Sequence, residues 1–399
     1  MKNLDDFDFN EKRVLLRLDL NSPVIDGVVQ DNERFAAHSE TVKELLKKNA
    51  SVIIIAHQGR PGDKDFVSLE QHAELLSKHV KKKVKFVSDL FGDCALSEIA
   101  KLKPGRALLL ENLRFYSEEL VEKNFENTVM VSRLSKACDV FVDDAFSVAH
   151  RVQTSIVGFP KVMPSFAGRV MQREYAAISK AISNIERPYV MVLGGSKPDD
   201  VVKLLKHALS AGTADKILCS GVIGELLLLA KGEDLGYKSK WLEQQGYTKN
   251  LPELKTLVEK YSDKLVLPTD FALKDRDGIR LEVLLKQLPS VANTESSMPG
   301  DIGSKTAYLF DSAIQQAKTV YYKGPQGIFE EPAFELGTRS VLKSIASCKG
   351  FVLMGGGHSL TALDKFNVSK KKVSHISIAG GALIAMLCGE SLPGVEVLQ

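Results

Sequence analysis

The sequence contains few cysteines and no pair of them in a recognisable pattern. The five are odd in number and widely spaced, and no C-x-x-C motif occurs among Cys94, Cys138, Cys219, Cys348 and Cys388. A disulfide framework or a zinc site of the usual spacing needs paired cysteines, so the sequence favours neither. We expect reduced, mostly buried thiols in a cytoplasmic protein.

Long apolar runs and a strong charge of one sign are also absent. The longest apolar candidate, around residues 226–230, is far shorter than the about 20 residues of a membrane-spanning helix, and residues 1–6 lack the apolar region of a secretion signal. The formal net charge is only +3, whereas binding to nucleic acid normally requires a dense basic face. We therefore expect no membrane insertion, no export and no nucleic-acid partner.

Short apolar runs that end in polar or glycine turns are what the sequence does have. They alternate with segments of helical periodicity such as 33–48 and 198–209, and this alternation predicts parallel sheets covered by helices on both faces. Because 399 residues exceed what one core usually supports, we predict an α/β fold with two Rossmann-like parallel-sheet domains. The predicted strands lie at 14–18, 52–56, 107–110, 140–142, 189–193, 217–219, 265–267, 320–322, 351–354 and 376–378.

One amphipathic segment, 166–185, follows the best candidate for a domain boundary, Gly158-Phe159-Pro160. Met171, Ile178 and Ile185 recur every seven residues, which gives a helix an apolar stripe suited to lying between two bodies. We predict an N-terminal domain at 1–160, a connector helix within 161–186 and a C-terminal domain at 187–385.

The first strand end and the helix after it carry polar groups that could bind a ligand. Arg17, Asp19 and Asn21 alternate along the chain and point to one face of a strand, although an Asx and proline turn explains this segment equally well. Arg34 lies in the predicted first turn of a helix, where a cation opposes the helix dipole. A residue that costs local stability is a functional candidate, unless it pairs with Asp31 or Glu33.

Three further strand ends in the first half each deliver an arginine. Ligands of open α/β sheets bind beyond the carboxyl ends of the strands, and clustered arginines suit a small, multiply charged anion. A single such arginine would more often form a surface ion pair, but four strand ends with the same feature favour an anion site. The segments are His57-Gln58-Gly59-Arg60-Pro61, Glu111-Asn112-Leu113-Arg114 and 143–151, which ends in His150-Arg151.

Glycine turns replace the arginines in the second half. Gly194-Gly195-Ser196-Lys197 precedes a predicted helix that starts with Pro198, and such a turn suits phosphates because backbone N–H groups can approach them. Lys197 could accompany a transferring phosphoryl group, and Glu330 could accept ribose hydroxyls. A Walker A loop and a G-x-G-x-x-G after the first strand are both absent. An anion site in one domain and a nucleotide site in the other indicate a kinase.

The order and spacing of the motifs resemble the phosphoglycerate kinase family, from near Leu4 to the C-terminus. The archaeal branch is the most similar, through His57-Gln58-Gly59, Asp301-Ile302-Gly303 and the histidine of Gly355-Gly356-Gly357-His358-Ser359. The matching patterns are R-x-D-x-N-x-P, H-x-G-R-P, E-N-L-R-F, D-A-F-x-x-A-H-R, G-G-x-K, G-P-x-G-x-F-E and G-G-G-[DH]-S.

The resemblance implies reversible phosphoryl transfer from 1,3-bisphosphoglycerate to ADP, giving 3-phosphoglycerate and ATP with Mg²⁺ in glycolysis or gluconeogenesis. It implies that the two domains close about a hinge, that residues 386–399 return to the first domain, and that the protein is a monomer or homodimer. The resemblance does not distinguish ADP from GDP as the substrate, and it does not identify the metal ligands. Arg34 and Lys197 would be catalytic. The implied phosphoglycerate ligands are Asp19, Leu20, Asn21, Arg34, His57, Gln58, Gly59, Arg60, Arg114 and Arg151, and the nucleotide ligands are Lys197, Glu330, Gly355, Gly356, Gly357 and His358.

Several positions depart from the family pattern. Val201 stands where many members carry a second lysine, His358 where many carry a magnesium-associated aspartate, and Lys323 where the family has asparagine. Lys323 and Ile378-Ala379 are compatible with an alternative, a non-catalytic nucleotide- or phosphoglycerate-binding paralogue. A nicotinamide-dependent dehydrogenase would explain the glycine turns but not the arginines.

Overall fold

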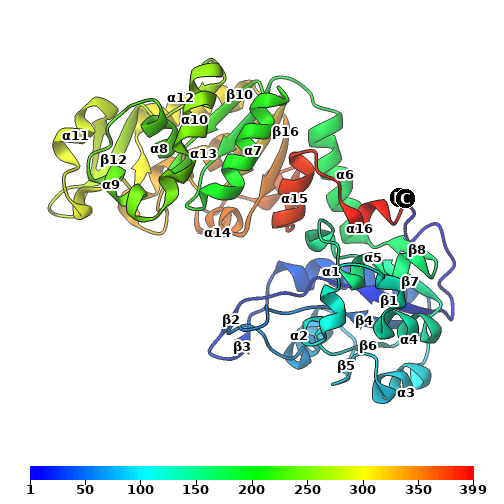
Figure 1. Cartoon of the computed structure of the whole chain (residues 1–399). Coiled ribbons are helices and arrows are strands. Elements are labelled where there is room, and N and C mark those ends of the chain that lie inside the picture. The colour runs from blue at the N-terminus through cyan, green and yellow to red at the C-terminus, as the bar shows by residue number, and fades with distance from the viewer. The chain divides into compact units, whose positions relative to one another are not determined.

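The computed structural model describes residues 1–399, which form two compact units. Unit 1 comprises Met1–Ala176 and Gly381–Gln399, and unit 2 comprises Ala177–Gly380. Each unit has its own six-stranded parallel sheet, and the helix α6 (Arg169–Ser183) runs from one unit into the other (Figure 1). The predicted α/β class with two parallel-sheet domains is confirmed.

The sheet of unit 1 brings the polar strand ends to one edge. Its order is β5-β6-β4-β1-β7-β8, and Arg17 at the end of β1 is in register with Ile55 of β4 and Asp143 of β7. The residues that follow these three strands therefore leave the sheet side by side. The strands are β1 (Arg13–Arg17), β4 (Ser51–Ile55), β5 (Val84–Phe86), β6 (Ala107–Leu109), β7 (Val140–Asp143) and β8 (Ser165–Ala167), with a hairpin of β2 (Val24–Ile25) and β3 (Val28–Val29).

Helices cover both faces of this sheet, as the continuous apolar strands predict. Along β1, Val14 and Leu16 pack into one apolar cluster and Leu15 packs into another. The first cluster includes residues of α1 and α2, and the second includes residues of α3 and α4. The helices of unit 1 are α1 (Glu33–Lys47), α2 (Glu70–Val80), α3 (Asp93–Lys101), α4 (Val129–Ala137), α5 (Thr154–Val157) and α16 (Pro393–Glu396), together with most of α15 (Gly380–Leu387).

The sheet of unit 2 has the order β11-β10-β9-β15-β16-β17. Lys323, at the end of the central strand β15, is in register with Leu193 of β9 and with Gly355 of β16. The glycine turns that follow β9, β15 and β16 therefore adjoin one another. The strands are β9 (Tyr189–Leu193), β10 (Lys216–Cys219), β11 (Leu265–Val266), β15 (Thr319–Lys323), β16 (Phe351–Gly355) and β17 (His375–Ser377).

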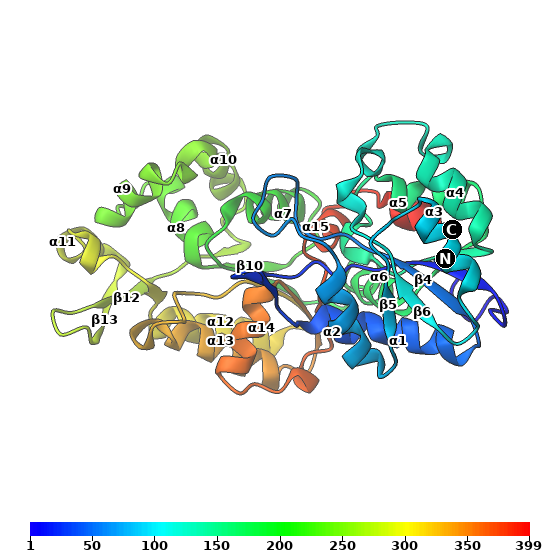
Figure 2. The same cartoon turned by 90° about the horizontal axis from the view of Figure 1, so that it is seen from below.

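In unit 2, α12, α13 and α14 lie on one side of the sheet, and α7 and α8 lie on the other (Figure 2). A second, antiparallel sheet of order β13-β12-β14 adjoins it and was not predicted. The helices are α7 (Pro198–Ser210), α8 (Gly221–Ala230), α9 (Tyr237–Gln244), α10 (Leu251–Lys260), α11 (Leu288–Val291), α12 (Ser304–Gln316), α13 (Leu336–Ser347) and α14 (Gly357–Lys365), and the added strands are β12 (Asp270–Lys274), β13 (Arg280–Leu284) and β14 (Asp301–Ile302).

The predicted helix at 166–185 was too long. Phe166 belongs to β8, where it is in register with Val142, and α6 begins only at Arg169. Asp144 sets this start, because its Oδ1 accepts hydrogen bonds from the N–H groups of Val170 at 2.8 Å and Met171 at 3.3 Å. The helix therefore begins where a carboxylate satisfies its first donors.

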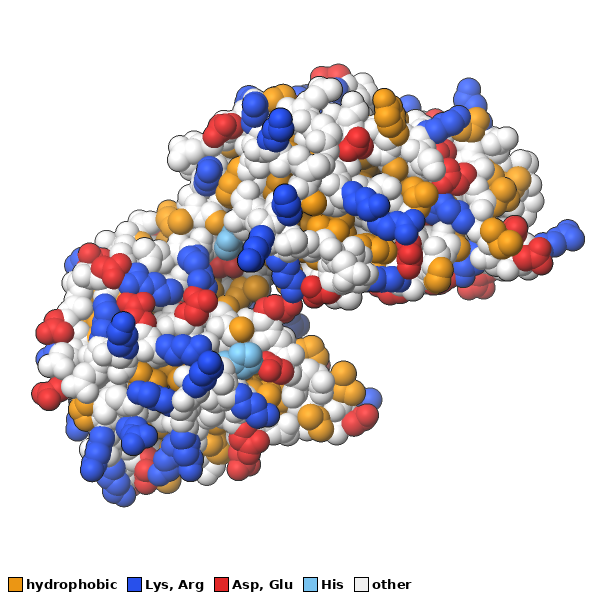
Figure 3. All heavy atoms as spheres, turned by 180° about the vertical axis from the view of Figure 1, so that it is seen from behind, with side chains coloured by type: hydrophobic (Ala, Val, Ile, Leu, Met, Phe, Trp, Pro, Cys, Tyr) orange, Lys and Arg blue, Asp and Glu red, His pale blue; other side chains and the backbone are white.

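The surface carries charged side chains of both signs (Figure 3). Basic and acidic side chains both occur over the face seen in Figure 3, and basic side chains are the more numerous on its lower left part. No helix combines the length and the apolar character needed to cross a membrane.

Candidate active site

Asp19 and Arg34 meet at the strand edge of unit 1. One Asp19 oxygen accepts hydrogen bonds from Arg34 and from the Ser147 hydroxyl, and the other accepts from the Asn21 N–H at 3.1 Å. Arg34 lies in the first turn of α1, as predicted, and its partner is Asp19 rather than Asp31 or Glu33. Asp19 is almost fully buried while Arg34 is partly exposed, so Arg34 is held in place and remains accessible to a ligand.

The Asp19 carboxylate stays ionised in this setting. Burial alone would raise its pKa, but the charge of Arg34 and the hydrogen bond from Ser147 outweigh burial and lower the pKa well below its usual value. The ionised carboxylate of Asp19 therefore holds the guanidinium of Arg34 in position.

His57 has a defined protonation state because Arg17 lies beneath it. Arg17 is fully buried, and its Nη2 is 3.0 Å from Nδ1 of His57. A guanidinium can only donate, so Nδ1 must accept and Nε2 carries the proton. Burial, followed by the charge of Arg17, lowers the pKa of His57 well below its usual value. His57 is therefore a neutral imidazole that offers one N–H donor to a ligand.

A buried chain of hydrogen bonds holds Arg17 itself. Its Nε donates to Oγ of Ser155 at 2.9 Å, and the Ser155 hydroxyl donates to Glu119 at 2.8 Å. The Ser155 N–H also donates to Glu119 at 2.9 Å. Burial raises the pKa of Glu119, although the charge of Arg17 opposes this effect. The sequence motifs gave no signal for Glu119 or Ser155, because both lie outside the strand ends.

Three further arginines of unit 1, Arg60, Arg114 and Arg151, lie close to one another and to Arg17. Burial and the nearby charges of Arg151 and Arg17 lower the pKa of Arg114 to about 10, and burial and Arg60 lower that of Arg151. Neither these two nor Arg60 forms an ion pair with an acidic side chain. Positive charges that lie close together favour the binding of anions. The structure thus brings Arg17, Arg60, Arg114 and Arg151 together at the strand ends, as expected.

The backbone between these side chains is fixed tightly. Gly59 has φ of +65°, and a Cβ there would lie 2.4 Å from the Asp65 carbonyl oxygen, so only glycine fits. Its N–H donates to Asn21 Oδ1 at 2.9 Å, and its carbonyl accepts from Arg114. Gln58 is fully buried and donates to the Ser22 carbonyl at 2.9 Å, and Leu20 is also fully buried. These two residues shape the loops under the site.

The glycine turns of unit 2 touch backbone to backbone. The Gly194 N–H donates to the Lys323 carbonyl and the Gly195 N–H to the Pro325 carbonyl, both at 2.8 Å. A Cβ on Gly194 would lie 2.4 Å from the Pro325 oxygen, and a Cβ on Gly324 would lie 2.6 Å from the Gly194 oxygen. The turns after β9 and β15 can therefore approach this closely only as glycines.

Helices begin at two of these turns. Lys197 is the N-cap residue of α7, with Pro198 first in the helix and Asp199 and Asp200 in its first turn, as predicted. Gly356, with φ of +96°, is the N-cap residue of α14. Between the two helix starts lies Lys323, whose Nζ is 3.8 Å from Asp200. Helix N-termini and an ammonium group at one sheet edge favour phosphate, and Lys323 was not among the predicted ligands.

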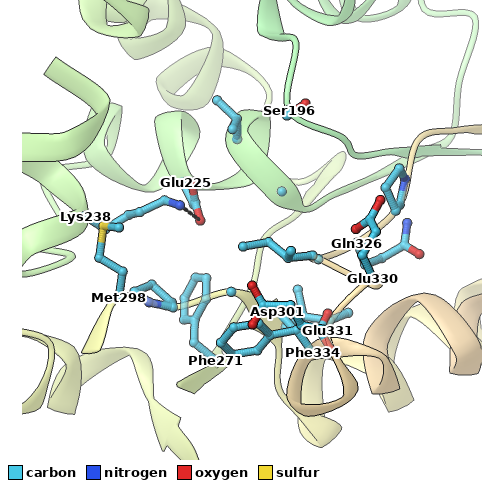
Figure 4. Close-up of a pocket in the computed structure, with 18 of the residues that line it drawn as sticks. Ser196, Glu225, Lys238, Phe271, Met298, Asp301, Gln326, Glu330, Glu331 and Phe334 are labelled. Carbon is cyan, nitrogen blue, oxygen red and sulfur yellow. Dashed lines mark ion pairs between the residues drawn. The ribbon is translucent and has the colours of Figure 1, made fainter. Parts of the chain in front are cut away.

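A cavity of about 540 Å³ opens beside the turns in unit 2 (Figure 4). Glu330 and His358 line it, whereas Lys197 and Gly355–Gly357 do not. Much of its lining is apolar, and Figure 4 shows Phe271, Met298 and Phe334 on one side. The buried Glu225 and Lys238 also line it. A pocket with apolar walls and a few polar groups suits a nucleoside.

No group of three or more His, Cys, Asp and Glu side chains could hold a metal ion. The chain therefore offers no all-protein cage, but Mg²⁺ commonly binds through one or two carboxylates plus substrate phosphates. Asp200, exposed in the first turn of α7, is a carboxylate in a suitable place, so the residues fit a magnesium ion that arrives with a nucleotide.

Comparison with known proteins gives a consistent result. The family model described as phosphoglycerate kinase matches residues 4–390. The chain is 42% identical over 402 residues to the phosphoglycerate kinase of Methanothermus fervidus, covering 99% of the chain and 96% of the relative. It is 41% identical over 403 residues to that of Sulfurisphaera tokodaii, with 99% and 95% covered.

Solved structures of phosphoglycerate kinases are also similar to this chain. The crystal structure of phosphoglycerate kinase from Pyrococcus horikoshii OT3 matches with a TM-score of 0.91 and 36% identity, covering 100% of this chain and 98% of that chain. The structure of phosphoglycerate kinase from Coxiella burnetii matches with a TM-score of 0.81 and 31% identity, covering 99% and 98%.

Proposed function

Because the chain belongs to the phosphoglycerate kinase family and is a phosphotransferase, we propose that its two clusters bind the two substrates of that reaction. Unit 1 binds 3-phosphoglycerate or 1,3-bisphosphoglycerate, and unit 2 binds ADP or ATP. A non-catalytic paralogue is not favoured, since the relatives are named as kinases. The observation that carries the assignment is the cluster of Arg60, Arg114 and Arg151 near Arg17, none of which forms an ion pair with an acidic side chain.

The phosphoglycerate fits the charges of unit 1. Its phosphate and carboxylate are anions, and the arginines can bind them by forked, charge-assisted hydrogen bonds. His57 donates from Nε2 to a ligand oxygen, and Asn21 and Gly59 shape the floor. Arg34, aimed by Asp19, lies against the transferring phosphoryl group and neutralises the charge on its oxygens. Leu20 and Gln58 contribute by fixing the loops.

The nucleotide fits unit 2. The glycine turns at 194–195 and 355–357 hold the phosphates through backbone N–H groups, and Lys197 and Lys323 supply positive charge. Glu330 accepts hydrogen bonds from ribose hydroxyls, and His358 lies at the cavity end of the second turn. Asp200 would hold the Mg²⁺ that accompanies the nucleotide and lowers the negative charge of its phosphates.

The reaction exchanges one phosphorus–oxygen bond for another. The bond between phosphorus and the acyl oxygen of 1,3-bisphosphoglycerate breaks, and a β-phosphate oxygen of ADP forms the new bond. The carboxylate leaves without needing a proton, so positioning and charge neutralisation are the main tasks of the protein. Both ligands must meet with water excluded, and we propose that the units approach each other for each turnover.

A coupled assay of ATP formation tests this function. With 1,3-bisphosphoglycerate, ADP and Mg²⁺ we expect turnover, and with a chelator in place of Mg²⁺ we expect a large loss. Lys197→Ala should lower turnover, whereas Lys286→Ala, an exposed lysine of unit 2, should leave it unchanged. Binding of both substrates without ATP formation would instead support the paralogue.

All five cysteines are free thiols, and three of them are buried, which suits a reducing compartment. We propose a cytoplasmic enzyme that acts as a monomer or homodimer, and light scattering of the purified chain measures which of the two forms is present.

A further inference from the structure

Lys365 is the last residue of α14 and lies against the loop that carries Glu330. Its ammonium donates hydrogen bonds to two consecutive carbonyl oxygens, that of Phe329 at 2.6 Å and that of Glu330 at 3.1 Å. No backbone N–H donates to either carbonyl, and the loop 324–331 belongs to no helix or strand. The backbone at Glu330 therefore depends on a side chain from another element.

Phe329 fixes the chain on the other side of this contact. Its side chain is buried, with 1% exposed, and its ring packs edge-on against Phe366 with the ring centres 6.2 Å apart. The Lys365 ammonium lies 5.9 Å from the centre of each ring, close enough for a cation–π contact. The main chain therefore enters Glu330 from a defined position.

The charge of Lys365 is already balanced within the protein. Nζ is 2.9 Å from Oε1 of Glu335, the N-cap residue of α13. Lys365 also lies at the C-terminal end of α14, where a cation is favourable, and about 12 Å along the helix axis from the glycine turn at the other end. Lys365 is therefore no ligand of phosphates at that turn, and it can act on a nucleotide only through the residues that it holds.

Glu330 is the residue through which Lys365 can act. Figure 4 shows Glu330 beside Gln326 in the unit 2 cavity, and His358, in the first turn of α14, lines the same cavity. One helix thus begins at the proposed phosphate turn and ends at the contact that holds the loop of the proposed ribose acid. A site held by a helix is more precise than one held by a loop alone.

We propose that Lys365 is a positioning residue, which keeps Glu330 within reach of the ribose while the phosphates lie on the turn 355–357. This role rests on the proposed contact between Glu330 and the ribose hydroxyls. Without the ammonium, the carbonyls of Phe329 and Glu330 lose their donor and the loop moves. Lys365 therefore lowers the KM for the nucleotide through the ribose hydroxyls, and not through the phosphates or the base.

Steady-state kinetics of the full-length protein with ADP and with 2′,3′-dideoxy-ADP, which lacks both ribose hydroxyls, test this role. In the parent, the KM for dideoxy-ADP should exceed that for ADP about tenfold or more, as expected for a hydrogen bond to a charged group. In Lys365→Met, the KM for ADP should rise while that for dideoxy-ADP stays the same, so the ratio of the two KM values approaches one. The turnover number should stay near that of the parent, because the ribose contact is the same in the ground state and the transition state.

Further variants locate the effect. Lys365→Arg keeps a cation with several donors and should retain most of the parent ratio. Lys371→Met changes an exposed lysine that follows α14 and should leave the ratio unchanged. Glu330→Ala should lower the ratio as Lys365→Met does, and the double variant should lower it no further, because both residues act on one contact.

The ratio of two KM values does not depend on how much of the sample is folded, so a less stable variant still gives a result. Lys365→Gln, which removes the charge, replaces the methionine variant if that variant does not fold, and its ratio should also fall. The parent ratio in Lys365→Met or in Lys365→Gln would overturn the role of Lys365.

Failure of the proposed function looks different. If Glu330 does not contact the ribose, the parent and Glu330→Ala would share a ratio near one, and the role of Lys365 would fall with that contact. If the chain is not a kinase, the parent would form no ATP in the coupled assay.

Discussion

The buried guanidinium of Arg17 lies 3.0 Å from Nδ1 of His57 and thereby decides which ring nitrogen carries the proton. A side chain that never reaches the ligand thus sets the donor that the ligand meets. In the same site, Asp19 holds Arg34. The neutral His57 and the cationic Arg34 are therefore each held by a buried partner, a pattern typical of preorganised sites.

Replacing Arg17 tests the control of His57. In Arg17→Met, the imidazole loses both its donor and a neighbouring positive charge, so the His57 pKa should rise toward its usual value and the Nε2–H form should give way to a mixture of tautomers. Long-range ¹H–¹⁵N spectra across a pH titration measure both effects.

Arg60→Met is the matched control, because Arg60 is not among the charges that shift the His57 pKa. Arg17→Lys keeps a positive charge at the buried position and can be measured in its place if the methionine variant does not fold. A His57 spectrum that is the same in the Arg17 variants as in the parent would contradict this interpretation.

Arg34→Ala should reduce the turnover number about a hundredfold, as loss of one contact to a transition-state charge commonly does. It should also destabilise the fold, because the buried Asp19 carboxylate loses its main counterion. Steady-state kinetics and urea unfolding separate these effects.

The double variant Arg34→Ala with Asp19→Asn also removes the negative charge of the buried Asp19 carboxylate, which has lost its counterion in Arg34→Ala. Stability should recover in part while turnover stays low. Recovery of turnover together with stability would mean that Arg34 has only a structural role. Arg106→Ala, an exposed arginine of unit 1, should change neither quantity.

His72 should make the protein less stable in mild acid. Its Nε2 donates to Gln58 at 3.0 Å, and the buried Nδ1 has no partner that could accept a second proton. Burial lowers the pKa of His72 from 6.5 to about 4. The unfolded chain therefore takes up a proton first as the pH falls below 6.5, and folding stability declines between pH 6.5 and pH 4.

The size of this contribution is about 3 kcal/mol, from about 1.4 kcal/mol for each unit of pKa shift. Urea unfolding at intervals from pH 7 to pH 4 should show a shallower decline for His72→Leu than for the parent. His207→Leu, on α7, serves as the control. An equal decline in parent and His72→Leu would show that His72 does not contribute.

Much of the fold was readable from the sequence, because strands buried on both faces leave continuous apolar runs. The predicted strand 189–193 has the observed bounds of β9, and the predicted helix at 33–48 is one residue longer than α1. The strand β8 was missed because three residues are too few to show a period. The antiparallel sheet was missed because β13 alternates polar and apolar residues and β14 has only two residues.

Some residues of the candidate site could likewise be predicted from the sequence, and others could not. Residues at strand ends, such as His57 and Arg114, were found because topology alone brings strand ends together. Glu119 and Ser155 make contacts between segments that are distant in the chain, for example 138 residues between Arg17 and Ser155. No local pattern marks such contacts, so only the folded structure reveals them.

Lys323 should contribute to nucleotide binding as the second cation beside Lys197. It ends the central strand of its sheet, in register with the residues that lead into two glycine turns, and its ammonium lies 3.8 Å from Asp200. In Lys323→Met the KM for the nucleoside diphosphate should rise about tenfold, as expected for loss of one charge-assisted hydrogen bond, and KM should depend less steeply on salt. Lys286→Met, an exposed lysine of the same unit, supplies the baseline. If KM and its salt dependence are the same in Lys323→Met as in the parent, the Lys323 ammonium does not contribute to nucleotide binding, and the phosphates rely on Lys197 and the glycine turns.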